Sequence, residues 1–187
     1  MKIGVFGGTF DPVHNGHINA FAETYIGLEL DQVIIVPTFI SPLKKQAGSS
    51  ESHRLNMLKL AVENYDFAEI DTFEIDQQEV TYTFDTLKYL RNKYPDDDLY
   101  FIIGTDHFIS FDKWKNADKL HKLAKFTVLD RNDELYNIKP PFIKLNTNIV
   151  EVSSTLIRER LKTNTEVRHL MPEEVYGYIK EQRLYET

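Results

Sequence analysis

The segment at 7–17 (GGTFDPVHNGH) combines two glycines with two histidines three positions apart. Glycine lets a backbone approach a ligand closely because no Cβ intrudes, and its N–H group can point at an anion. His14 and His17 fall at the start of an expected helix and share one face of it, where imidazole N–H groups can donate to phosphate oxygens. The positive end of the helix dipole lies at the same place. The segment therefore predicts a phosphate-binding loop.

Taken singly, the residues of this segment also fit ordinary structural roles. A Gly-Gly pair after a strand is often only a tight turn, and a single histidine is usually structural or exposed. His-x-x-His can be half of a metal site, but no third ligand is evident nearby in the sequence. The Gly-x-Gly-x-x-Gly pattern of dinucleotide-binding enzymes is absent from the sequence, which disfavours a dehydrogenase. As one string opening a strand–helix unit, the segment favours phosphate binding.

A second segment, VSSTLIRER, lies at 152–160. Ser153, Ser154 and Thr155 are residue types that cap helices and bind phosphate, and Arg158 follows one helical turn later. Taken alone, the segment is better explained as a well-capped surface helix. A third segment, FIIGTDH, lies at 101–107, where Gly104 permits close approach and Asp106 can accept hydrogen bonds from sugar hydroxyls. An aspartate after a strand is equally typical of a helix N-cap.

The elements that must position these segments are short apolar runs alternating with helical stretches. This alternation predicts an α/β fold with a parallel sheet, on which ligands bind outside the carboxyl ends of the strands. All three segments fall at such ends, so they should converge in space. We expect strands at 2–6, 33–36, 99–103, 126–129 and 149–152, an extended stretch at 67–75, helices at 16–26, 52–64, 83–93, 153–161 and 172–182, and loops at 41–50 and 130–146.

The composition narrows the class of protein. The 187 residues suggest a single domain at 1–187, with a small C-terminal helical portion from about 153. The chain has no cysteine, which excludes disulfides and thiolate metal sites and fits the cytoplasm. A net charge of −7 disfavours general nucleic-acid binding. No apolar stretch is long enough to span a membrane, and the apolar run at the N-terminus is too short for a signal peptide.

The first segment resembles the signature Gly-x-Phe-x-Pro-x-His-x-Gly-His of the nucleotidyltransferase superfamily. The 152–160 segment resembles its Ser-Ser-Thr-x-Ile-Arg element, and the resemblance extends over the whole chain. It implies a Rossmann-like three-layer sandwich of the nucleotidyltransferase type, with a mostly parallel sheet and helices on both faces. The signature positions are Gly8, Phe10, Pro12, His14, Gly16 and His17, and those of the second element are Ser153, Ser154, Thr155, Ile157 and Arg158.

The resemblance implies that ATP binds at these segments. His14, His17 and Arg158 become the candidate catalytic residues, with His17 nearer the transferred group. No carboxylate cage is evident in the sequence, so no residue is assigned as a metal ligand, and Mg²⁺ is expected to arrive on the ATP phosphates. The remaining candidate ATP-binding residues are Gly7, Gly8, Thr9, Phe10, Gly16, Lys44, Gly104, Asp106, Ser153, Ser154 and Thr155.

Three further stretches resemble the members that act on nicotinate mononucleotide. VTYTFDTL at 80–87 resembles the element beside the nicotinate ring and assigns Tyr82 and Thr83 to the acceptor. Lys113-Trp114 resembles a pair that packs on that ring, and an indole suits stacking on a pyridinium. Arg131 follows a strand where these members often carry arginine. Without the resemblance, Trp114 would be explained as a core or anchor aromatic.

The expected reaction is attack of the acceptor's 5′-phosphate on the α-phosphorus of ATP, with loss of pyrophosphate. Leu43 and Lys115 depart from the family pattern and bear on the acceptor contacts. The alternatives are an adenylyltransferase for nicotinamide mononucleotide or phosphopantetheine and a non-catalytic nucleotide sensor. ATP and nicotinate mononucleotide are thus the expected partners, with no nucleic acid and no membrane, while a homodimer stays open.

Overall fold

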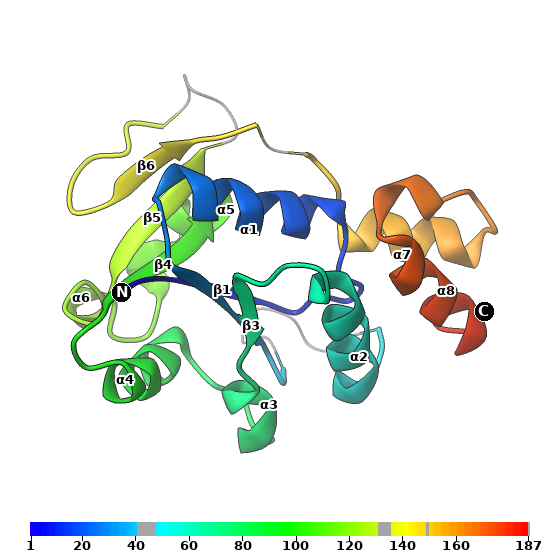
Figure 1. Ribbon diagram of the computed structural model, residues 1–187, viewed down its shortest axis with the longest axis horizontal. Helices are drawn as coiled ribbons and strands as arrows, with labels where there is room; N and C mark the ends of the chain where they lie inside the picture. Colours follow the sequence, from blue (N-terminus) through cyan, green and yellow to red (C-terminus); the bar gives the residue numbers. More distant parts are fainter. Residues whose placement is uncertain (41–47, 131–135, 149, 187) are drawn as a thin grey trace.

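The computed structural model describes residues 1–40, 48–130, 136–148 and 150–186. At its centre lies a six-stranded sheet with the order β3-β2-β1-β4-β5-β6, in which all neighbouring strands are parallel (Figure 1). The predicted α/β fold is confirmed, and the described sheet is wholly rather than mostly parallel. The strands are β1 (Lys2–Gly8), β2 (Gln32–Pro37), β3 (Ala68–Ile70), β4 (Asp98–Gly104), β5 (Lys125–Asp130) and β6 (Ile143–Asn146).

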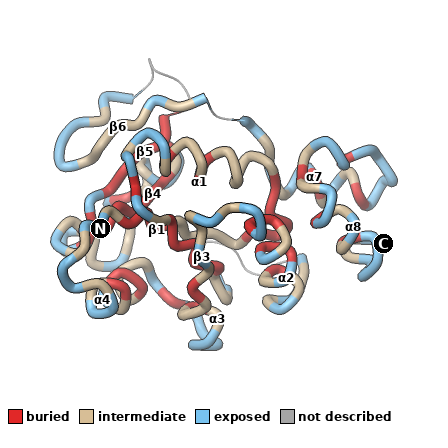
Figure 2. The backbone as a smooth tube through the Cα atoms, viewed as in Figure 1, coloured by how far each residue is buried: buried red, intermediate tan, exposed pale blue. Residues whose placement is uncertain are grey.

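Helices cover both faces of the sheet. Successive side chains of a strand point to opposite faces, and in β2 this sends Val33 and Ile35 into one core cluster and Ile34 and Val36 into another. A central strand buried on both faces is apolar throughout, as β2 is. Figure 2 shows the buried segments gathered on the central strands and the helix faces against them. The first face carries α1 (Asn15–Gly27) and α2 (Glu51–Val62), and the second carries α4 (Thr83–Lys93), η1 (Phe111–Lys113) and α6 (Ala117–Leu120).

The C-terminal helices α7 (Ser154–Lys162) and α8 (Glu173–Glu181), linked through η2 (Arg168–Leu170), lie beside α2. Val175 and Ile179 of α8 are fully buried in the same cluster as Met57 of α2. The hydroxyl of Tyr178 lies 2.8 Å from Nδ1 of His53, also on α2. Among the described residues, none of the helices has the length and apolar character that crossing a membrane requires.

The prediction that residues 67–75 are extended is wrong for the second half of this stretch. β3 covers only Ala68–Ile70, and α3 (Phe73–Gln77) follows. The Asp71 carboxylate accepts a hydrogen bond from the N–H of Phe73 at 3.0 Å, a local bond that turns the chain out of the sheet.

The last strand lies earlier in the chain than predicted. The expected strand at 149–152 is absent from the described residues 150–152, and the expected loop at 130–146 contains β6. β6 pairs with β5 from Thr127 and Ile143 onwards. The N–H of Val150 instead donates to the side chain of Asn19 at 2.9 Å, so it is not available to a strand ladder.

The strand order creates a crevice beside β1. From β1 the chain builds β2 and β3 on one side and then crosses to β4 on the other. The loops that leave the carboxyl ends of β1 and β4 therefore run apart, which is where sheets of this kind bind ligands. Helix α1 follows β1, and α5 (Thr105–Ile109) follows β4.

Candidate active site

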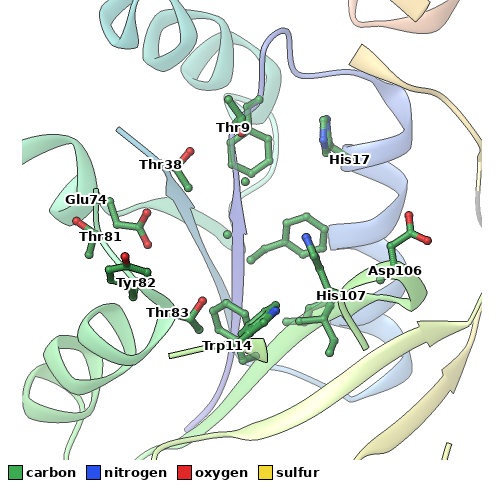
Figure 3. A pocket seen from close by; sticks show the side chains of 18 of the residues that line it. Thr9, His17, Thr38, Glu74, Thr81, Tyr82, Thr83, Asp106, His107 and Trp114 are labelled. Atoms are coloured by element: carbon green, nitrogen blue, oxygen red, sulfur yellow. The ribbon is translucent and has the colours of Figure 1, made fainter. Parts of the chain in front are cut away.

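A cavity of about 490 Å³ occupies this crevice. Figure 3 shows His17 and Asp106 on one side of it, and Glu74, Thr81 and Tyr82 on the other. The predicted site residues that line the cavity are Gly7, Gly8, Thr9, Phe10, His17, Tyr82, Thr83, Gly104, Asp106, Trp114, Ser154 and Arg158.

The two glycines end β1 instead of belonging to the loop after it. Gly8 pairs in register with Pro37 of β2. The ring of Phe10, a residue with φ of 51°, folds back over Gly8, and a Cβ on Gly8 would lie 2.8 Å from its Cζ. Glycine at position 8 is therefore required by close packing at the start of the loop.

His14 and His17 cap α1 reciprocally. Nδ1 of His14 accepts from the N–H of His17, and Nδ1 of His17 accepts from the N–H of His14, both at 3.3 Å. The rings stack with centroids 3.7 Å apart. Because each Nδ1 is an acceptor, each neutral ring carries its proton on Nε2. His17 lines the cavity, so it can present an N–H donor to an anion there.

His14 and Gly16 are not among the lining residues. His14 is 5% exposed and lies behind His17 as the N-cap residue. A Cβ on Gly16 would lie 2.8 Å from the carbonyl oxygen of Val150 and 3.1 Å from the His14 ring. The missing Cβ of Gly16 therefore makes room for His14 and for the chain at Val150.

Arg158 is held against the first loop by Asp11, a residue that sequence reasoning did not single out. Its Nη1 donates to the carbonyl of Asp11 at 2.6 Å and lies 3.7 Å from the Asp11 carboxylate, and its Nη2 donates to Thr155 at 3.2 Å. The carboxylate of Asp11 also accepts hydrogen bonds from Gly48, Ser49 and Tyr185. One buried carboxylate thus joins the loop after β1, the segment before α2, helix α7 and the C-terminal tail.

A buried arginine fixes the other side of this loop. Arg54 is 1% exposed and donates to the carbonyl oxygens of Thr9 at 2.8 Å, Thr38 at 2.6 Å and Phe39 at 2.8 Å. Burial lowers the pKa of its guanidinium from the ordinary value, but arginine stays charged at any working pH. Arg54 stands one helical turn before Met57 and Leu58, and a charge inside an apolar stripe was the signal that could have found it.

The turn after β4 places Gly104 and Asp106 at the cavity. Gly104 is the N-cap residue of α5 and, as a glycine, has no side chain with which to cap the helix. Asp106 is exposed in the first turn of α5, so the N-cap explanation of Asp106 is wrong. Asp106 lines the cavity and lies on the same side of it as His17 (Figure 3).

The opposite end of the cavity carries the predicted acceptor residues. Thr83 begins α4 beside Tyr82, and the half-buried Trp114 packs against Phe111 at 5.5 Å between ring centroids. Nζ of Lys115 lies 4.5 Å from the centre of the Tyr82 ring. Sequence reasoning assigned no role to four residues that line this cavity, Thr38, Glu74, Thr81 and His107.

The second predicted segment contributes less than expected. Ser153 is the N-cap of α7, accepting from Leu156 at 3.1 Å, and neither Ser153 nor Thr155 lines the cavity. Ser154 does line it and donates to the carbonyl of Pro12 at 2.9 Å. The predicted Lys44 and Arg131, and the departure at Leu43, lie outside the described residues.

Comparison with known proteins assigns the chain to a family. A family model described as cytidylyltransferase-like matches residues 5–160, from β1 into α7. The chain belongs to this cytidylyltransferase-like family. Its relatives include a Bacillus subtilis protein named nicotinate-nucleotide adenylyltransferase, 38% identical over 100% of this chain and 99% of that protein. Another, from Bacillus licheniformis and named "Probable nicotinate-nucleotide adenylyltransferase", is 42% identical over 100% of this chain and 99% of that protein.

Solved structures share the fold of this chain. Plasmodium falciparum nicotinic acid mononucleotide adenylyltransferase complexed with NaAD superposes with a TM-score of 0.78 at 21% identity, covering 98% of this chain and 97% of that chain. The same enzyme complexed with APC gives 0.78 at 20% identity, covering 98% and 96%. At these identities the likeness shows the fold. The family resemblance predicted from the sequence is confirmed.

Several basic side chains line the cytidylyltransferase-like site. His17, His107, Lys113, Lys115 and Arg158 line the cavity. Among the described residues there is no group of three or more histidines, aspartates or glutamates that could hold a metal ion. Membership of this family suggests dependence on a divalent metal, and the carboxylate of Asp106 lies in the same cavity.

Proposed function

We propose that the protein transfers the adenylyl group of ATP to nicotinate mononucleotide, giving nicotinic acid adenine dinucleotide and pyrophosphate, a step of NAD biosynthesis. The observation that carries this proposal is the cavity itself. His17 and Arg158, whose side chains can donate to phosphate, line the same hollow as Trp114 and Thr83, an aromatic side chain and a helix start, and this supports the proposal. The relatives that share the full length of the chain are named for this activity.

The phosphate side would hold ATP. Nε2–H of His17 donates to an oxygen on the transferred phosphate, and His14 keeps that ring in place from behind. Arg158 and Ser154 take the outer phosphates, and Mg²⁺ enters with ATP as part of the substrate. The N–H groups at the end of β1 and the start of the loop contact the nucleotide through Gly7 and Gly8.

The acceptor side would hold the nicotinate. The indole of Trp114 stacks on the pyridinium ring, and the N–H groups at the start of α4, beginning at Thr83, receive its carboxylate. An oxygen of the acceptor's 5′-phosphate then forms a bond to the α-phosphorus of ATP. The bond from that phosphorus to the bridging oxygen breaks, and its electron pair leaves with pyrophosphate. A phosphate dianion is already a nucleophile, so the protein supplies position and charge stabilisation.

Release of pyrophosphate tests the proposal directly. The purified protein is given ATP and Mg²⁺ with nicotinate mononucleotide, nicotinamide mononucleotide or phosphopantetheine. A large preference for nicotinate mononucleotide in kcat/KM is expected. Release with phosphopantetheine alone would overturn the assignment of the acceptor, and ATP binding without release in any mixture would favour a nucleotide sensor. A cytoplasmic location and a homodimer stay sequence-based predictions.

A further inference from the structure

A buried carboxyl group lies on the wall of the acceptor end of the cavity. Glu74 of α3 is 6% exposed and nevertheless lines the cavity. In Figure 3 its carboxyl points toward the open space and lies next to Thr81 and Tyr82, on the side opposite His17. The proposed function places the carboxylate of nicotinate at this end, near Thr83.

No described cation compensates this carboxyl group. Its one hydrogen-bond partner among the described residues is the hydroxyl of Thr86, which donates to Oε1 at 2.6 Å. Burial raises the pKa of Glu74 to about 7, and the Thr86 hydroxyl opposes this only in part. The lysines at the end of α4 and after η1 are paired with other carboxylates: Lys93 with Asp71 at 2.8 Å, and Lys115 with Asp85 at 3.1 Å.

An ionised Glu74 would conflict with the proposed acceptor. Two carboxylates facing each other in one hollow repel, whereas a neutral carboxyl group donates a hydrogen bond to a carboxylate. The start of α4 adds further donors at the same place, because Tyr82, its N-cap residue, makes no side-chain cap bond. The two features together suit an anionic acceptor group only when Glu74 carries a proton.

We propose that Glu74 is a specificity-determining residue for the acceptor, binding the carboxylate of a pyridine nucleotide through the proton of its own neutral carboxyl group. This inference rests on the proposed function. It implies that Glu74 takes up a proton when nicotinate mononucleotide binds above neutral pH. Glu74 is ionised in the free enzyme at that pH and must be neutral in the complex. A carboxamide acceptor can pair with either form of Glu74, because its carbonyl oxygen accepts from the neutral carboxyl group and its NH₂ group donates to the ionised one.

The pH dependence follows from the pKa of about 7. Below that pH, Glu74 is protonated in the free enzyme and nicotinate mononucleotide binds without proton uptake. Above it, the kcat/KM for nicotinate mononucleotide should fall by up to about tenfold per pH unit relative to that for nicotinamide mononucleotide. The ratio of the two acceptors removes the titration of the 5′-phosphate, which both acceptors share. The basic groups of the cavity, His17, His107, Lys113 and Lys115, are separated from Glu74 by repeating the measurement in a variant at position 74.

The decisive variant is Glu74→Gln, which keeps the shape and a hydrogen-bond donor but cannot titrate. The acceptor ratio is measured from pH 6 to 9 in the wild type and in the variant. A ratio that falls above pH 7 in the wild type and is flat in Glu74→Gln is expected. Glu79→Gln is the matched control, since Glu79 is exposed a few residues away, and it should keep the wild-type profile. A profile that is the same in Glu74→Gln and in the wild type would overturn the inference.

Calorimetry of the wild-type protein remains decisive even if the Glu74→Gln variant fails to fold. Binding of each acceptor at pH 8 is measured in two buffers of different ionisation enthalpy. Binding of nicotinate mononucleotide should be accompanied by uptake of close to one proton more than binding of nicotinamide mononucleotide. The reason is that Glu74, with a pKa of about 7, is mostly ionised in the free enzyme at pH 8. Equal proton uptake would reject the role of Glu74. If neither acceptor is turned over, the proposed function fails, and that result is distinct from both of these.

Discussion

His17 and His14 occupy different positions although they belong to one motif. His17 reaches the cavity, while His14 is buried behind it, and each accepts the other's backbone N–H. Spacing on the helix could predict that the two rings lie together. Spacing alone does not say which ring faces the ligand. The family resemblance predicted His17 as the nearer ring, and His17 is the one that lines the cavity.

Replacing His17 by alanine should lower kcat by about 100- to 1,000-fold, the usual effect of removing one donor to a transition-state oxyanion. The fold should survive, at a cost of roughly 1 kcal/mol for the lost cap. Steady-state kinetics and thermal unfolding measure the two effects. His169→Ala, a change at an exposed histidine, is the control. Near-normal kcat in a folded His17→Ala protein would rule out this role.

Replacing Trp114 by alanine should raise the KM of the acceptor more than that of ATP. Stacking of a cation on indole contributes about 1–2 kcal/mol, which corresponds to about a 5- to 30-fold rise in KM. Trp114→Phe keeps a ring and should recover part of the affinity. Equal rises in both KM values would count against stacking and favour a packing role against Phe111.

At the scale of single residues, contiguous motifs were predictable and isolated partners were not. The string at 7–17 contains its own context, so its glycines and histidines could be assigned together. Glu74 and Asp11 act through contacts with residues distant in sequence, the hydroxyl groups of Thr86 and Tyr185. A lone acidic residue in a sequence gives no sign of such a partner.

At the scale of elements, four segments meet at Asp11, and the tail supplies one of them. The hydroxyl of Tyr185 donates to the Asp11 carboxylate at 2.7 Å, and burial raises the pKa of this tyrosine, so it remains a donor at any working pH. Because Arg158 contacts the carbonyl of the same Asp11, the tail helps to hold the phosphate side of the cavity.

Tyr185→Phe should therefore raise the KM of ATP several-fold and leave the KM of the acceptor unchanged, with a loss of about 1–2 kcal/mol of stability. Tyr178→Phe is the matched control. It removes hydroxyl contacts to His53 and Asn56 on α2, away from the cavity, and should affect stability alone. Equal ATP effects in the two variants would assign Tyr185 a purely structural role.

Elements with strong local signals were well predicted. The helix expected at 83–93 has those limits in the structure, since its apolar periodicity and the following proline define it. The error at 149–152 arose because a short apolar run is compatible with a strand, and only the tertiary bond from Val150 to Asn19 excludes one. β6 has a weak pattern of its own and forms because β5 offers it an edge.

At the scale of the whole molecule, the C-terminal helices share a core with the sheet. Ile179 is fully buried among residues of α2 and the first sheet face. Alternation along the sequence could predict a parallel sheet. It could not predict the strand order, because the crossing from β3 to β4 is decided by which edge of β1 remains open.

Ile179→Ala should lower the free energy of unfolding by about 2–4 kcal/mol. Unfolding should remain a single cooperative transition, as expected if residues 1–187 form one domain. Urea unfolding is followed by circular dichroism and by the fluorescence of Trp114, the one tryptophan, which packs on the opposite sheet face. The two probes should coincide. Ile26→Ala, at a residue that is 68% exposed, should change little. Two separate transitions would divide the chain into two domains.

The reciprocal cap of α1 has a consequence for the timing of catalysis. Since folding engages Nδ1 of both rings, the proton on Nε2 is in place before any nucleotide arrives. Stabilising the charge that develops on a phosphate oxygen then requires neither a proton shift nor a ring flip, and so little reorganisation accompanies the chemical step. Under the proposed mechanism, the bonds that start helix α1 also hold His17 ready to donate to phosphate between turnovers.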